Sequence, residues 1–64
     1  MMYVYVLFDR TNSQFYTFNR RWSKYLNKSK IYVNLNDARK RRGSFAKPLV
    51  VEIQQYKLEY EKST

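Results

Sequence analysis

MYVYVLF, residues 2–8, is the most informative stretch of the chain for its architecture. Its β-branched and aromatic residues favour an extended strand over a helix. Bulky apolar side chains occupy both alternating sets of positions, so other parts of the protein would have to cover both faces of such a strand. A strand of this kind is typical of the interior of a sheet, and we therefore predict a central strand.

A hairpin is predicted by the next ten residues. Residues 9–13 (DRTNS) are polar. Asp and Asn side chains hydrogen-bond to nearby backbone in turns, and Asn also tolerates a positive φ. Residues 14–18 (QFYTF) return to a strand pattern, so the sequence predicts two antiparallel strands joined by a polar turn.

The following segment, residues 19–30, is compatible with two local structures. Trp22, Tyr25 and Leu26 have the i, i+3, i+4 spacing of one or two helical turns. A packed loop fits equally well, because polar residues interrupt any longer helix. Residues 30–33 (KIYV) then predict a short third strand.

A short helix is marked at both ends. Asn34 is a favourable N-cap, and Asp37 places a negative charge in the first turn. Four cations at positions 39–42 lie near the expected C-terminus, where the helix dipole favours them. Gly43 can adopt the left-handed conformation that ends many helices. We therefore predict a helix over residues 35–42.

The last strand is predicted to begin at Leu49. Its apolar positions change from odd to even numbers near residues 54–55. A bulge or a strong twist is therefore expected there if all of these side chains are to share one face. The polar residues 59–64 are expected to fray.

Together these elements predict one small α+β domain over residues 1–64. It is a small twisted antiparallel sheet of three to four strands with one short helix, in the order β-β-(β)-α-β. The predicted core residues are Tyr5, Leu7, Phe15, Leu35, Ala38, Leu49, Val51 and Ile53, and Phe8 and Phe18 are interpreted as further core residues.

The composition excludes several function classes. The chain has no Cys and no His, which removes disulfides, a thiol nucleophile, a zinc finger and an imidazole base. One Gly leaves no phosphate-binding loop, and the five carboxylates are scattered, so we predict no catalytic site, no metal and no cofactor. No apolar run approaches the ~20 residues of a membrane span. We therefore predict a non-catalytic binding protein of the cytoplasm, with no membrane partner.

The charge distribution points to a partner. The chain carries 13 Lys and Arg against 5 Asp and Glu, a net charge of +8. Residues 20–47 hold ten of the cations and only one carboxylate, a net +9, and charge on this scale attracts polyanions. Interleaved aromatic side chains offer faces on which bases stack. The predicted nucleic-acid or partner-binding residues are Arg20, Arg21, Lys24, Lys28, Lys30, Arg39, Lys40, Arg41, Arg42 and Lys47 with Trp22, Tyr25 and Tyr32, and Phe45 is a further aromatic candidate. A solvated face that only aids solubility would show the same charge pattern.

The order of short motifs resembles that of small bacteriophage-encoded accessory proteins. A strand with YVLF, a polar turn, a strand with FY, a single Trp, KIY and a helix with NDARK make up this layout over residues 3–58. The resemblance implies stoichiometric interference with a host enzyme or a defence system, including CRISPR nucleases. Many such inhibitors are acidic mimics of nucleic acid, whereas this chain is basic. Mimicry therefore fits poorly, while binding to guide RNA, to DNA or to an acidic protein groove stays open.

Two functions thus compete. In the first, the basic face binds nucleic acid or a nucleoprotein complex in the cytoplasm of a host or infected bacterial cell. In the alternative, the chain is a protein-directed stoichiometric inhibitor whose sheet edge or aromatic patch docks on a larger partner. Added salt weakens the first contact steeply and the second hardly at all. Uncovered sheet edges also predict a homodimer, which the high net charge opposes.

Overall fold

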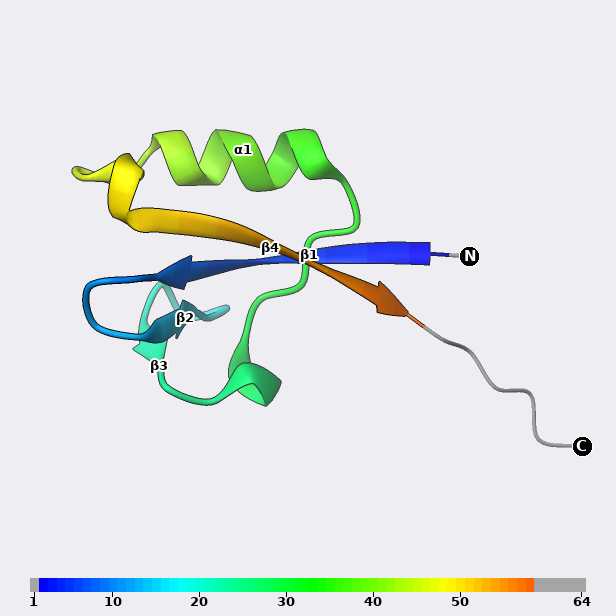
Figure 1. Cartoon of the computed structure of the whole chain (residues 1–64), viewed down its shortest axis with the longest axis horizontal. Helices are drawn as coiled ribbons and strands as arrows, with labels where there is room; N and C mark the ends of the chain where they lie inside the picture. Colours follow the sequence, from blue (N-terminus) through cyan, green and yellow to red (C-terminus); the bar gives the residue numbers. More distant parts are fainter. Residues whose placement is uncertain (1, 59–64) are drawn as a thin grey trace, which may run out of the picture.

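A four-stranded antiparallel sheet carries one α-helix on one face, in a computed structural model that describes residues 2–58 (Figure 1). The spatial order of the strands is β3-β2-β1-β4. Along the chain the elements are β1 (Met2–Asp9), β2 (Gln14–Tyr16), β3 (Trp22–Ser23), the 3₁₀ turn η1 (Leu26–Lys28), α1 (Leu35–Gly43), the 3₁₀ turn η2 (Pro48–Val50) and β4 (Val51–Leu58). The predicted α+β class, with one helix between the third and the last strand, is confirmed.

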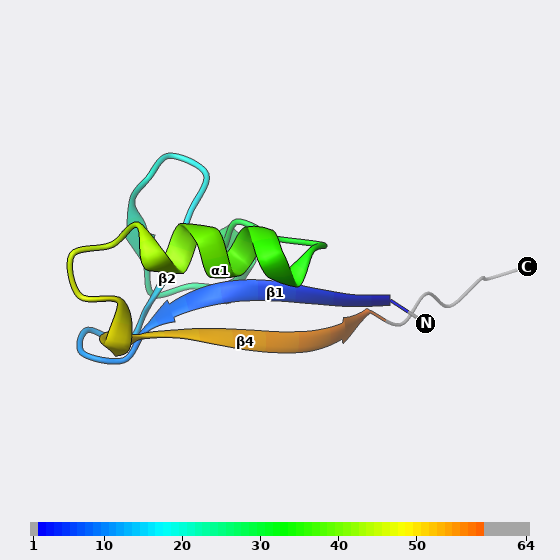
Figure 2. The ribbon, with the colours of Figure 1, turned by 90° about the horizontal axis from the view of Figure 1, so that it is seen from above.

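β1 is the central strand that residues 2–8 predicted. It pairs antiparallel with β4 in an unbroken register over its whole length, and the two strands run side by side in Figure 2. Its other edge pairs with β2 near the hairpin and with Tyr32 further along. The N–H of Tyr5 donates to the Tyr32 carbonyl at 2.7 Å, and the N–H of Tyr32 donates back at 2.8 Å. At Tyr5 and near the hairpin, β1 therefore has a partner on each edge.

The turn between β1 and β2 is held by the side chain of Asp9, as its polar composition predicted. One carboxylate oxygen accepts a hydrogen bond from the backbone N–H of Thr11, and the other accepts one from the side-chain amide of Asn12, both at 2.9 Å. The residue with positive φ is Ser13, at 54°, instead of the Asn that the sequence suggested. Asp9 is buried, so these bonds replace its contacts with water.

The second and third strands differ from the prediction. β2 ends at Tyr16, two residues earlier than expected, because the chain turns back over residues 17–21 and forms β3. β3 thus lies in the segment for which helical turns or a loop were predicted. The predicted strand over 30–33 is wrong, because only Tyr32 bridges to Tyr5 before the chain leaves the sheet for α1.

The last strand also begins and continues differently. β4 starts at Val51, because η2 occupies the three residues before it. Leu49 is consequently 77% exposed instead of lying in the core, and Val50 packs against the core. The register with β1 continues through residues 54–55 without a bulge, so the apolar side chains of β4 divide between the two faces of the sheet. Residues 59–64, which were predicted to fray, lie outside the described part of the chain.

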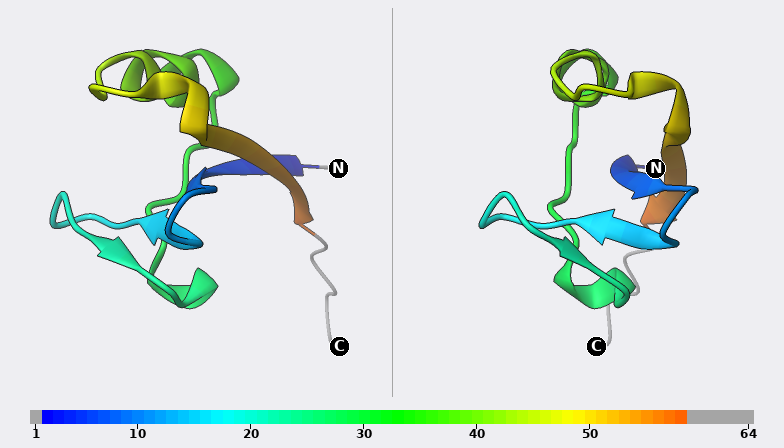
Figure 3. Two further views of the ribbon diagram at one scale, coloured as in Figure 1. Left: turned by 60° about the vertical axis from the view of Figure 1, so that its left-hand side comes forward. Right: turned by 90° about the vertical axis from the view of Figure 1, so that its left-hand side faces the viewer.

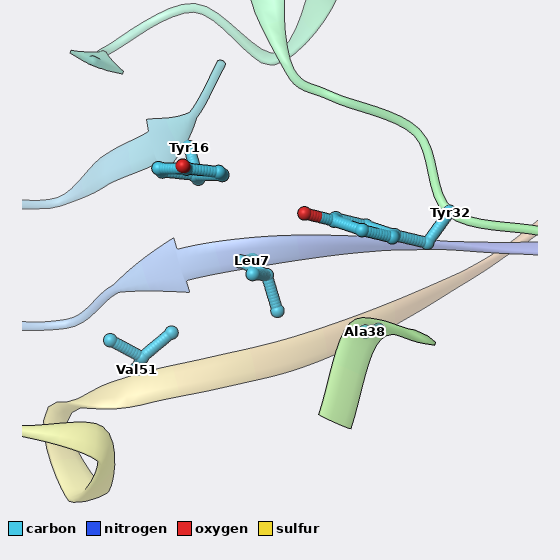
Figure 4. Close-up of a cluster of buried hydrophobic side chains, with 5 residues drawn as sticks. All are labelled: Leu7, Tyr16, Tyr32, Ala38 and Val51. Carbon is cyan, nitrogen blue, oxygen red and sulfur yellow. The ribbon is translucent and has the colours of Figure 1, made fainter. Parts of the chain in front are cut away.

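One hydrophobic core lies between α1 and the sheet (Figure 4). Its buried members come from three strands, the bridge at Tyr32 and the helix: Leu7, Tyr16, Tyr32, Ala38 and Val51. Partly buried side chains pack against them: Tyr5, Trp22, Phe45, Val50 and Ile53. The predicted core residues Leu7, Ala38 and Val51 are thus buried, and Tyr5 and Ile53 pack against them. Leu35 is half-buried and does not belong to this cluster.

The opposite face of the sheet has its own apolar contacts. Val6 is fully buried there, and the rings of Phe8 and Phe15 pack with centroids 4.9 Å apart. Phe15 therefore belongs to this face and not to the core beneath α1, because its partner in the ladder, Phe8, alternates with the core residue Leu7. Phe18, also predicted as core, is 72% exposed.

The helix begins as predicted and ends differently. The side chain of Asn34 caps the N-terminus by accepting the N–H of Asn36 at 2.8 Å. The helix includes Gly43, which has no positive φ, so the predicted left-handed ending is wrong. Ser44 ends the helix instead: its φ is −82°, and its hydroxyl donates to the carbonyl of Arg41 at 2.6 Å. A side-chain hydrogen bond thus satisfies a carbonyl at the end of the helix, where a left-handed glycine was predicted.

Candidate nucleic-acid interface

The first candidate site is a groove of about 570 Å³ beside the β2–β3 hairpin and η1. Three aromatic and two cationic side chains line it, and no carboxylate from the described residues does so. We call it the aromatic groove; its lining residues are Thr17, Phe18, Asn19, Arg21, Trp22, Ser23, Tyr25, Asn27 and Lys28.

The hairpin loop between β2 and β3 brings Phe18 to this groove. The N–H of Arg20 donates to the carbonyl of Thr17 at 3.3 Å, and the N–H of Thr17 donates to the carbonyl of Arg21 at 2.9 Å. Arg20 has a φ of 57°, so the loop combines a tight turn with one left-handed residue, a common three-residue hairpin connection. This geometry places Phe18 at the tip of the loop, in solvent.

Tyr25 forms the other side of the aromatic groove. Its N–H donates to the hydroxyl of Ser23 at 3.1 Å, and its carbonyl accepts the N–H of Lys28 at 3.2 Å, which starts η1. The ring is 56% exposed, and the Lys24 ammonium lies 5.5 Å from its centroid. Two exposed rings therefore flank a cationic groove.

The second candidate site is a cleft of about 540 Å³ between α1 and the segment that precedes it. Three cations line it against one carboxylate, and the Lys30 ammonium lies 5.2 Å from the centroid of the Tyr32 ring. We call it the helix cleft; its lining residues are Lys30, Ile31, Tyr32, Val33, Asp37, Lys40, Arg41 and Ser44.

The hydroxyl of Tyr32 is the unusual polar group of this cleft. It is buried and has no hydrogen-bond partner among the described residues. Burial raises the pKa of Tyr32 above its ordinary value, and the nearby Arg41 guanidinium opposes this shift without forming a hydrogen bond of good geometry. Tyr32 therefore stays neutral over the physiological range.

The two sites adjoin. Lys28 lines the aromatic groove and Lys30 lines the helix cleft. Ser29 between them is extended, so the two Cα atoms are about 7 Å apart. Figure 3 shows the chain passing from η1 to α1 along one side of the sheet. Cations predicted from one continuous segment are thus divided between two neighbouring hollows.

The other predicted cations fall into two groups. Arg42 is half-buried, and its Nε donates to the backbone carbonyl of Val51 at 2.6 Å, which gives it a structural contact. The remaining cations are exposed and line neither site: Arg20, Lys24, Arg39 and Lys47. Four adjacent cations on α1 therefore have different surroundings, although the sequence presents them as one run.

The predicted aromatic residues are mostly used for packing. The rings of Trp22, Tyr16 and Phe45 contact one another with centroids 5.1–5.4 Å apart. Tyr32 is only 8% exposed, which leaves no free face for a base. Tyr25 keeps its exposure, and Phe18, which sequence reasoning assigned to the core, joins it. The signal for Phe18 was the Asn that follows it, since Asn is frequent in turns.

The described part of the chain, residues 2–58, holds no candidate metal site. Within that range no group of three or more Asp or Glu side chains lies close enough to hold a metal ion. No helix there is long and apolar enough to cross a membrane.

Comparison with known proteins adds no relative. The chain matches no protein-family model, no curated protein and no solved structure. The resemblance to small phage accessory proteins therefore stays a prediction.

Proposed function

We propose that this protein is a non-catalytic nucleic-acid-binding protein that contacts phosphates through the aromatic groove and the helix cleft. One observation carries the proposal: the two adjoining sites are lined by five cations, Arg21, Lys28, Lys30, Lys40 and Arg41, against a single carboxylate. The proposed setting is that of a small phage accessory protein acting on nucleic acid, or on a nucleoprotein complex, in a bacterial cytoplasm.

The arrangement of the five cations suits the phosphate backbone of a nucleic acid better than it suits one small anion. Cations spread over two neighbouring hollows match a chain of regularly spaced negative charges, and each contact releases condensed counterions from the nucleic acid. The two arginines among them, Arg21 and Arg41, can bind phosphate oxygens in bidentate fashion. Lys30 and Arg41 are half-buried and therefore lose less side-chain freedom on binding than fully exposed cations do.

The salt dependence of binding tests the proposal. We expect the affinity for a short oligonucleotide to fall steeply between about 50 and 200 mM KCl. Lys40→Gln should weaken binding and reduce the slope of log K against log salt by about one, because it removes one phosphate contact. Fluorescence anisotropy of a labelled oligonucleotide measures both quantities.

Gln55→Glu is the matched control. It lowers the net charge by one, as Lys40→Gln does, but lies on β4, and its side chain lines neither site. Its slope should equal that of the unchanged protein. Equal slopes for both variants would mean that only the overall charge matters. Failure to bind any oligonucleotide at low salt would contradict the proposal and favour the protein-directed inhibitor.

A further inference from the structure

We infer that the aromatic groove is a base-stacking site which makes the protein selective for single-stranded over double-stranded nucleic acid. This inference rests on the proposed nucleic-acid binding and specifies the class of ligand. Its elements are the exposed rings of Phe18 and Tyr25, the cations that line the same groove and the loop that presents Phe18.

The exposure of Phe18 has no structural explanation. Single exposed apolar residues are common, and Leu49 is one of them. Phe18 differs because it shares a groove with Tyr25 and Trp22. Clustered exposed rings lose favourable contacts that the core of a 64-residue protein needs, so their position outside it points to a ligand.

The loop that holds Phe18 is also strained. Arg20 adopts the left-handed conformation that glycine adopts without cost, and a side chain there costs the fold free energy. Arg20 is an exposed cation two positions after Phe18, and the next residue, Arg21, lines the groove with Phe18, so one short loop carries both charge and an exposed ring.

The surroundings of the rings fit nucleotides. Arg21 and Lys28 line the groove, and no described carboxylate opposes them. Base–aromatic stacking contributes to binding of any base sequence, because every base has a π face, and it needs bases that are free of their own stack. In a duplex the bases face one another inside the helix and cannot reach Phe18 or Tyr25. Only a single strand can therefore use both the rings and the cations.

Binding of three matched ligands tests the inference: a dT oligonucleotide of about 12 nucleotides, an RNA oligonucleotide of the same length and a DNA duplex of the same length. Trp22, the only tryptophan, lines the groove and reports occupancy through its fluorescence. We expect both single strands to bind about tenfold or more tightly than the duplex and to quench Trp22. Phe18→Ala and Tyr25→Ala should each lower single-strand affinity about tenfold and leave duplex affinity unchanged.

Leu49→Ala is the control for loss of an exposed apolar side chain, and it should leave all three affinities unchanged. Because Phe18 and Tyr25 are exposed, circular dichroism should report an intact fold in both variants. Equal affinity for single strand and duplex, or wild-type affinity of both ring variants, would overturn the inference. If Lys40→Gln still lowered the salt slope in that case, nucleic-acid binding would stand without stacking. Absence of binding to every ligand would overturn both proposals.

Discussion

The four neighbouring cations of α1, residues 39–42, have different surroundings, although they form one uniform run in the sequence. Arg42 points toward the sheet and donates to the carbonyl of Val51, on the outer edge of β4. Arg39 points into solvent. Charge alone therefore does not define the working surface, and a variant that changes the whole run would mix binding with folding.

Arg42→Ala should destabilise the protein, whereas Arg39→Ala should not. Loss of the Arg42 side chain leaves a carbonyl of a buried residue without this donor, and we expect the free energy of unfolding to fall by about 1–2 kcal/mol. Urea unfolding followed by circular dichroism measures it. Equal stability of the two variants would show that the Arg42 hydrogen bond contributes nothing measurable.

Tyr32→Phe should stabilise the protein. Its hydroxyl loses water on folding and gains no partner, so removing it should raise the free energy of unfolding by about 1 kcal/mol.

The raised pKa of Tyr32 also makes stability depend on pH. The pKa is higher in the folded protein than in the unfolded chain, so when the pH rises above about 10, the ordinary value, the unfolded chain loses this proton first. The free energy of unfolding of the unchanged protein should therefore fall as the pH rises above about 10, and the part of this fall that is due to Tyr32 should be absent from Tyr32→Phe. The urea midpoints of both proteins between neutral pH and pH 11 provide the measurement. If the two midpoints change with pH in parallel, Tyr32 does not contribute to the pH dependence.

At the scale of elements, strong local signals predicted structure well. The apolar run of β1, the polar turn held by Asp9 and the cap at Asn34 each depend on residues next to one another, and all three are confirmed. The predicted start of β4 and the ending at Gly43 failed, because other local geometries satisfy the same backbone groups. Sequence patterns cannot choose between such alternatives when the energies are close.

The sequence identified the cations of the candidate site but not how they and the aromatic side chains are arranged. The cations of residues 20–47 were identified by composition, which needs no structure. Phe18 was assigned to the core because it continued the alternation of β2, and only the turn that follows Tyr16 removes it from the sheet. That turn depends on the pairing of β2 with β3. β3 has only two residues, which is too short to show a strand pattern in the sequence.

Arg20→Gly tests the strain in the β2–β3 loop. Glycine relieves a left-handed conformation that costs other residues about 1–2 kcal/mol, but it also gives the unfolded chain more freedom. We expect the free energy of unfolding to stay the same or to rise by up to about 1 kcal/mol. Arg20→Val, which is β-branched, should lower it. Thermal unfolding of both variants measures the difference, and a glycine variant less stable than the valine variant would refute this account of the loop.

In residues 2–58, the outer edge of β4 is the long edge of the sheet that has no neighbouring strand. Tyr5 exchanges its hydrogen bonds with Tyr32, so its backbone groups point away from β4. The paired residue Gln55 must then direct its own N–H and C=O away from β1, to the outside of the sheet. β3 offers only two residues at the opposite edge. Pairing between copies, if the predicted homodimer forms, would therefore use β4.

Self-association should depend on salt. The net charge of +8 repels copies from one another, so we expect a monomer at low salt and a growing dimer fraction at high salt, where the repulsion is screened. Gln55→Pro removes an outward donor without removing a bond to β1 and should abolish the dimer. Sedimentation velocity at both salt concentrations decides this. A monomer throughout, or a dimer that the proline leaves intact, would rule out edge pairing.

The pairing of Met2 with Leu58 also determines when the protein can fold. The longest ladder joins the first strand to the last, which makes the contact order high and folding comparatively slow. During synthesis all ten cations of residues 20–47 are made before β4 exists to complete the sheet. Until then the chain is an unselective polycation that attracts any polyanion nearby. Folding, which comes last, places five of these cations in the aromatic groove and the helix cleft.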